Sequence, residues 1–225
     1  MENNLIEVKN LNFKYGKESI LEDISFNIKN GQNVGILGRN GGGKSTLVKI
    51  ILGFLKPGSG AVIYNIEKNN MGYLPQLREF DSSFPITIFD LVISGLLNKE
   101  NLFRKFNEKE KKEALEIIKE FEITDIQNKL ISSVSGGQLQ RALIARAMIR
   151  KPKLLILDEP ESFLDKNFEQ KLYFKLSSMK DTTLLIISHE LDTVSKYVDS
   201  ILLVEKKAQF YENIDSFMFT KGDEQ

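Results

Sequence analysis

The sequence predicts an α/β protein: a buried parallel sheet with an antiparallel β piece at its N-terminal end and an inserted group of helices. Three observations predict this fold class. Apolar and polar side chains alternate near the N-terminus, a period of two that is typical of strands. Short, continuous apolar runs occur later in the chain, as in strands covered on both faces. Between about residues 85 and 150 the chain is mostly of helical character.

The N-terminal stretch is expected to form antiparallel β structure. Residues 6–10 and 11–15 each place every other side chain on one face, and the second series ends at Tyr15. The same alternation returns at residues 24–28, after the turn Tyr15-Gly16-Lys17. Two short alternating runs joined by a glycine-containing turn favour paired strands.

Three later segments predict the parallel sheet. They are the continuous apolar runs Val34–Leu37, Leu154–Leu157 and Leu184–Ile187. Runs of this length suit strands that are buried between layers of helices. Each run is followed by glycine or polar residues, and open α/β sheets place their ligands at the carboxyl ends of the strands. We therefore look for a site at that edge.

The region of about 85–150 predicts a helical subdomain inserted into the sheet domain. Asn107 can cap a helix with Glu110 three residues on, a variant of the capping box. Apolar residues then recur at i, i+3, i+4 and i+7 from Ala114 to Phe121, which is the spacing of a buried helical stripe. The 225 residues are enough for one domain with such an insertion.

Composition excludes several function classes. Lys plus Arg and Asp plus Glu both number 31, and no basic block stands out, which argues against nucleic acid as a partner. The chain has no cysteine, so disulfides and cysteine metal sites are excluded, and a reducing compartment fits. No secretory signal or membrane-spanning run is present in the sequence. Any membrane role would depend on a partner.

A phosphate-binding loop is predicted directly after the run Val34–Leu37. Residues 38–45 match G-x-x-x-x-G-K-S/T, and an apolar helical pattern follows from Thr46. Lys44 is expected to reach the terminal phosphates of a nucleotide, and Ser45 to bind Mg²⁺. A chance match of a glycine-rich turn is the alternative, but strand, loop and helix all fall where this motif requires them. The predicted nucleotide contacts in this loop are Gly38, Asn40, Gly41, Gly42, Gly43, Lys44, Ser45 and Thr46.

Acidic residues and a histidine follow the other two apolar runs. Asp158 is suited to hold Mg²⁺ through water, and Glu159 to orient and deprotonate an attacking water; a pair of solvated acids is the alternative. His189, the one histidine of the chain, follows the third run. A lone histidine is more often structural, yet its position predicts the same edge of the sheet as Asp158. There it could contact the γ-phosphate and the attacking water.

These motifs together resemble the ATPase subunits of ABC transporters. The phosphate loop, Ser135-Gly136-Gly137-Gln138 and Leu157-Asp158-Glu159-Pro160 occur in the family's order, and the resemblance runs from about Leu5 to about Tyr211. It implies a single domain over residues 1–225 with a P-loop NTPase (RecA-like) core. It also implies ATP hydrolysis with Mg²⁺, in which Lys44, Glu159 and His189 act on the γ-phosphate.

The resemblance also implies a dimer with shared sites. In the family, the segment Ser135–Gln138 contacts ATP bound to the opposite subunit, so two chains make two composite sites. Tyr15 would stack on adenine, with a core aromatic as the alternative. Gln76 would bind Mg²⁺ and link the site to a membrane partner, and an ordinary loop amide is its alternative. Asp165 would lie at the dimer interface, or else cap a helix.

A narrower resemblance concerns the cargo. Residues 72–76 and 84–92 look like the zinc and manganese importer ATPases, in which this region meets the membrane subunit; Phe84 and Ile86 would dock there, or else belong to the core. The implied partners are permease subunits at the cytoplasmic face of the membrane and, through them, a substrate-binding protein. Residues 162–165 lack the glycine usual in those importers. A transporter of another substrate and a soluble ABC ATPase remain alternatives.

Overall fold

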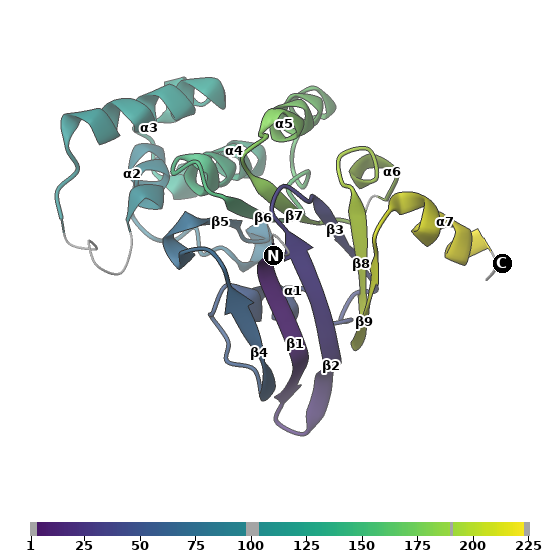
Figure 1. Cartoon of the computed structure of the whole chain (residues 1–225). Coiled ribbons are helices and arrows are strands. Elements are labelled where there is room, and N and C mark those ends of the chain that lie inside the picture. The colour runs from purple at the N-terminus through teal and green to yellow at the C-terminus, as the bar shows by residue number, and fades with distance from the viewer. Residues whose placement is uncertain (1–3, 98–103, 190, 223–225) are drawn as a thin grey trace.

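The computed structural model describes residues 4–97, 104–189 and 191–222, and it contains two sheets (Figure 1). The smaller sheet is antiparallel, with strand order β2-β1-β4. Its strands are β1 (Asn4–Tyr15), β2 (Glu18–Lys29) and β4 (Ser59–Tyr64). The expected antiparallel β structure at the N-terminus is therefore confirmed, and it extends to a third strand.

The larger sheet has six strands in the order β5-β6-β7-β3-β8-β9. All neighbouring strands in it run parallel except the pair β8–β9. The strands are β3 (Val34–Leu37), β5 (Met71–Leu74), β6 (Leu154–Asp158), β7 (Thr183–Ile187), β8 (Ser200–Glu205) and β9 (Lys207–Tyr211). The three apolar runs of the sequence are β3, β6 and β7, which lie next to one another at the centre.

Two hydrophobic cores explain why those central strands are continuously apolar. On β6, Leu155 and Leu157 belong to one core, whereas Leu154 and Ile156 belong to the other. The first core contains the helical region, and the second contains the antiparallel sheet and helix α1 (Lys44–Ile51). Because successive side chains of a strand point to opposite faces, a strand between two cores needs apolar residues at every position.

Helices gather beyond β5 on one side of the larger sheet (Figure 1). They are α2 (Ile88–Ile93), α3 (Glu108–Glu120) and α4 (Gly136–Met148). Asn107 and Glu110 form the predicted capping box on α3, and Ala114, Ile118 and Phe121 are buried. Residues 98–103 of this region lie outside the described residues.

The remaining helices are α5 (Lys166–Ser178), α6 (Leu191–Val194) and α7 (Ile214–Gly222). Single 3₁₀ turns occur at Lys68–Asn70, Leu77–Glu79, Ser94–Leu96, Thr124–Ile126 and Ile131–Ser133. No helix among the described residues is long and apolar enough to cross a bilayer.

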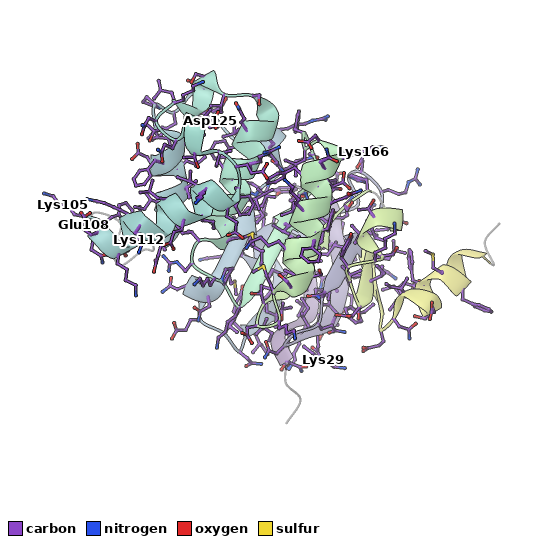
Figure 2. All side chains as sticks on the ribbon, turned by 90° about the horizontal axis from the view of Figure 1, so that it is seen from above. Lys29, Lys105, Glu108, Lys112, Asp125 and Lys166 are labelled. Carbon is purple, nitrogen blue, oxygen red and sulfur yellow. The ribbon has the colours of Figure 1, made fainter. Side chains whose placement is uncertain are left out.

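Lys105, Glu108 and Lys112 lie together at one end of the molecule, where acidic and basic side chains mix around the start of α3 (Figure 2).

Candidate active site

The carboxyl ends of four parallel strands meet around one pocket. Gly38 follows β3, Gln76 lies two residues after β5, Glu159 follows β6, and His189 lies two residues after β7. Since neighbouring parallel strands end at the same edge of a sheet, residues far apart in sequence converge there. The pocket has a volume of about 330 Å³. Its lining consists of Ile20, Asn40, Gly41, Gly42, Gly43, Lys44, Ser45, Thr46, Gln76, Asp158, Glu159, Ile187 and His189.

The phosphate-binding loop runs from β3 into α1. Gly43 stands at the N-cap of α1 with φ of 104°, a left-handed conformation that favours glycine. The helix then begins at Lys44, so its unpaired N–H groups face the loop. Backbone N–H groups and the positive end of a helix together favour an anion at this position.

Gly38 is held more tightly than the rest of the loop. Its φ is 139°, and a Cβ built on it would lie 2.1 Å from the backbone oxygen of Val204 on β8. Backbone cannot give way as a flexible side chain can. Any side chain at position 38 must therefore displace the loop or β8.

We expect Gly38→Ala to destabilise the fold and weaken ATP binding together. Backbone strain and the clash should cost about 2 kcal/mol, or roughly 4–8 °C in Tm for a domain of this size. The matched control is Gly31→Ala, since Gly31 also has positive φ (79°) but has no atom near its Cβ. The control should lose about half as much stability and keep its ATP affinity, measured by calorimetry. Equal ATP affinity in both variants would contradict this account.

Lys44 is buried in the loop, with 7% of its surface exposed. Its Nζ donates hydrogen bonds to the carbonyl oxygens of Gly38 (2.8 Å) and Arg39 (3.1 Å). Burial lowers the pKa of Lys44, and the nearby carboxylates of Asp158 and Glu159 act against that shift. The ammonium group thus lies inside the loop and close to the acidic residues at the end of β6.

Asp158 ends β6 and is almost fully buried at 2% exposure. The Ser45 hydroxyl donates to its Oδ2 at 3.4 Å. Gln76 lines the same pocket from the end of β5. The three residues that the sequence indicates for Mg²⁺ therefore line one cavity, and each carries a side-chain oxygen, the ligand that this ion prefers.

Glu159 is fixed on both sides of its carboxylate. Its Oε1 lies 3.0 Å from His189 Nε2, and its Oε2 accepts a hydrogen bond from the Ser162 hydroxyl at 3.3 Å. The backbone of Glu159 has φ of 52°, a left-handed conformation that costs energy in a residue other than glycine. Gln140 Nε2 donates to the carbonyl oxygens of Glu159 (3.3 Å) and Pro160 (3.2 Å) and so supports this turn.

The segment Ser135–Gln138 lies outside the phosphate pocket. Ser135 caps α4, and its side chain and that of Gln138 bond to each other's backbone N–H in a capping box. Ser135, Gly137 and Gln138 line a second pocket of about 450 Å³ with Phe163 and Asp165. The two pockets share no lining residue among the described parts of the chain. Gly136, Gly137 and Gln138 are thus not brought to Lys44 within one chain.

Phe163 packs directly against the two glycines of that segment. A Cβ on Gly136 would lie 3.1 Å from its ring, and one on Gly137 would lie 2.7 Å from its backbone oxygen. The φ of Phe163 is 65°, a value that glycine adopts more easily. Phe163 therefore holds a backbone conformation that costs energy in a residue other than glycine.

Tyr15 and Asp165 both lie outside the lining of the phosphate pocket. Tyr15 is 50% exposed at the end of β1, edge-on to the Phe13 ring, and does not line the phosphate pocket; a buried core role is thus excluded. Asp165 caps α5 by accepting from the Phe168 N–H at 3.0 Å, as the alternative interpretation expected. That bond, together with Arg141 2.8 Å away, lowers the pKa of the Asp165 carboxyl.

Several residues that line the phosphate pocket or support Glu159 were not predicted from the sequence. Ile20 and Ile187 line the phosphate pocket, although their apolar patterns indicate only strands. Gln140 is fully buried in α4, and a polar residue on the apolar face of a helix was the one available signal for it. Nothing in the sequence indicated that Ser162 would contact Glu159, because a serine in a loop has many ordinary roles.

Comparisons with known proteins identify the family of this chain. Residues 21–162 match the ABC transporter family. The zinc uptake system ATP-binding protein ZurA of Listeria innocua is 38% identical over 219 residues, 92% of this chain and 85% of that protein. The manganese transport system ATP-binding protein MntB of Listeria monocytogenes is 33% identical over 209 residues, 90% of this chain and 87% of that protein.

The same relationship holds for a solved structure. An ATP-binding subunit of an ABC transporter superposes with a TM-score of 0.83 at 25% identity, over 97% of this chain and 93% of that chain. Its agreement spans both sheets and the helical region, so the α/β P-loop fold predicted from the sequence is confirmed. On the family match and the identity to its relatives, this chain belongs to the ATP-hydrolysing, ATP-binding subunits of ABC transporters.

Proposed function

We propose that this chain is the ATP-hydrolysing subunit of an ABC importer for a divalent metal ion such as zinc or manganese. The observation that carries the proposal is the pocket shared by Lys44, Asp158, Glu159 and His189. The metal cargo rests on the zinc and manganese relatives and on the resemblance of residues 72–76 and 84–92 to such importers.

The pocket suits in-line attack of water on a γ-phosphate. Glu159, held by His189 at 3.0 Å and by Ser162 at 3.3 Å, is the candidate general base. Lys44 lies where it can stabilise charge on the terminal phosphates. His189 reaches the pocket from β7 and is suited to contact the γ-phosphate. Each of these roles uses a side chain that lines the same pocket.

Mg²⁺ fits the oxygen donors of Ser45, Gln76 and Asp158. The close approach of the Ser45 hydroxyl to Asp158 Oδ2, at 3.4 Å, makes a compact set of oxygen atoms. When bound there, the ion would neutralise part of the phosphate charge. Ser45 and Asp158 would hold it, and Gln76 would connect it to the end of β5.

The separation of the two pockets supports a homodimer. Ser135, Gly136, Gly137 and Gln138 lie at the positive end of α4, which suits a γ-phosphate, but they do not reach the phosphate pocket of their own chain. We therefore propose that they meet ATP bound to a second copy. Asp165 and Phe163 beside them would lie near the interface, and Tyr15 would stack on adenine.

Permease subunits and a substrate-binding protein are the proposed partners, at the cytoplasmic face of the membrane. Phe84 is 62% exposed and remains a candidate docking residue, whereas Ile86 packs against the helical core. Cargo choice would fall to those partners. An ABC transporter for another substrate is the second candidate, because the ATPase pocket would bind nucleotide and would not contact the transported substrate.

The test is to purify the tagged chain from membranes of its native host in mild detergent and measure metal uptake. We expect a multi-spanning protein in stoichiometric amount, and radioactive zinc or manganese uptake that Glu159→Gln abolishes. The control is Glu116→Gln, the same change on the exposed face of α3, which should keep uptake. Copurification of a soluble assembly without a membrane partner would contradict the transport proposal, and normal metal uptake in the Glu159→Gln strain would contradict the metal cargo.

A further inference from the structure

A second acidic residue, Glu161, lies two positions after Glu159 and does not line the phosphate pocket. One of its carboxylate oxygens accepts a hydrogen bond from the Ser188 hydroxyl at 2.5 Å, and the other accepts from the Tyr173 hydroxyl at 3.1 Å. Ser188 and Tyr173 are each only 1% exposed. The carboxylate therefore joins the turn after β6 to the end of β7 and to helix α5.

The contact between Glu161 and Ser188 matters because of where Ser188 lies in the chain. Ser188 is the residue directly before His189, whose Nε2 lies 3.0 Å from Glu159 Oε1. The turn 159–162 and the segment 188–189 are thus joined by the side-chain contacts of Glu161 with Ser188 and of Glu159 with His189. A third contact, between Ser162 and Glu159, closes the turn on itself.

We propose that Glu161 is a positioning residue for hydrolysis: by holding Ser188 it sets the place of His189 against Glu159. The proposal rests on the proposed roles of His189 and Glu159. It follows from geometry, because removing the acceptor leaves the end of β7 attached to this turn through fewer contacts. Misplacement of a reacting group by about 1 Å is enough to cost large factors in rate.

The same residue lies on the path to the second pocket. Phe163 is two positions further on and packs against Gly136. Glu161 thus lies in the chain between Phe163 and the turn residue Glu159, and its side chain contacts Ser188.

The test uses the whole purified chain and steady-state ATP hydrolysis with separate values of kcat and KM. Glu161→Leu removes both acceptor oxygens and should lower kcat about tenfold, with KM for ATP within about twofold. Glu161→Gln retains an oxygen for Ser188 and should recover kcat to within about threefold. Ser188→Ala should lower kcat like Glu161→Leu, and the double variant should be no slower than the slower single one, because both remove the same contact.

The matched control is Ser200→Ala. Ser200 is also fully buried and hydrogen-bonded, donating to the Glu212 carbonyl at 3.0 Å, but it begins β8 at the edge opposite the phosphate loop. The Tm of Ser200→Ala should fall about as much as that of Ser188→Ala, while its kcat should stay at the wild-type value. If Ser200→Ala lowers kcat as much as Ser188→Ala does, a general loss of stability explains the effect and the proposal is wrong.

Two further results would overturn the proposal: a wild-type kcat in Glu161→Leu, or additive losses in the double variant. Should Glu161→Leu fail to fold, Ser188→Ala carries the test alone, and a wild-type kcat in it overturns the proposal. Glu159→Gln is measured in the same assay. Its normal turnover would refute the site assignment itself, whereas failure of metal uptake would leave these kinetic comparisons unaffected.

Discussion

Glu159→Gln is expected to lower kcat for ATP hydrolysis by about 10²–10⁴-fold while ATP binding is kept. General-base catalysis contributes a factor of this size, and glutamine cannot take the proton from water. The amide keeps the shape of the side chain and an oxygen that can face Ser162 or His189, so the turn after β6 should remain folded. ATP-dependent dimerisation should persist and become easier to observe, because the closed state is not released by hydrolysis.

The measurement is single-turnover hydrolysis together with size-exclusion chromatography in the presence and absence of ATP. Glu116→Gln on α3 is the control for the same chemical change at an exposed position. Turnover near the wild-type rate in Glu159→Gln would remove Glu159 as the base. Loss of ATP binding in this variant would instead show that the carboxylate is needed to shape the pocket.

Lys44→Ala is expected to weaken both ATP binding and hydrolysis. The side chain lies inside the loop, with its Nζ on the carbonyl oxygens of Gly38 and Arg39, where a phosphate oxygen can exchange for these partners. A hydrogen bond from a charged group contributes about 1.5–3 kcal/mol to binding, which is roughly 10–150-fold in Kd. Loss of stabilisation of the charge that develops in the transition state should cost a further 10²–10³ in kcat.

The fold should tolerate this change better than the activity does. Burial lowers the pKa of Lys44, which means that the folded protein holds the ammonium at an energetic cost that alanine does not have. Tm should therefore fall little, and calorimetric titration with ATP can be compared at one temperature. Lys49→Ala, on the same helix but outside the pocket, is the control and should bind ATP normally. Wild-type affinity in Lys44→Ala would contradict the assigned role.

Local patterns in the sequence predicted much of the architecture. The loop 38–45 is a continuous segment, so its match places strand, turn and helix without knowledge of the rest of the fold. Asn107 with Glu110 predicted the start of α3 because a capping box is formed within four residues. The apolar runs of β3, β6 and β7 predicted buried strands, and parallel pairing then predicted that Asp158 and His189 would meet the loop.

The contacts that hold the proposed catalytic side chains were decided by the tertiary structure alone. Glu161 meets Ser188 across 27 positions, and Gln140 meets Glu159 across 19. No local spacing encodes such pairs, because they depend on how α4 and β7 pack against the turn after β6. The exposure of Tyr15 also depends on tertiary packing. Alternation in a strand separates two faces, but it does not show which face other elements cover. By itself the sequence predicted which residues carry the chemistry, and only the packing of distant elements determined how each one is held.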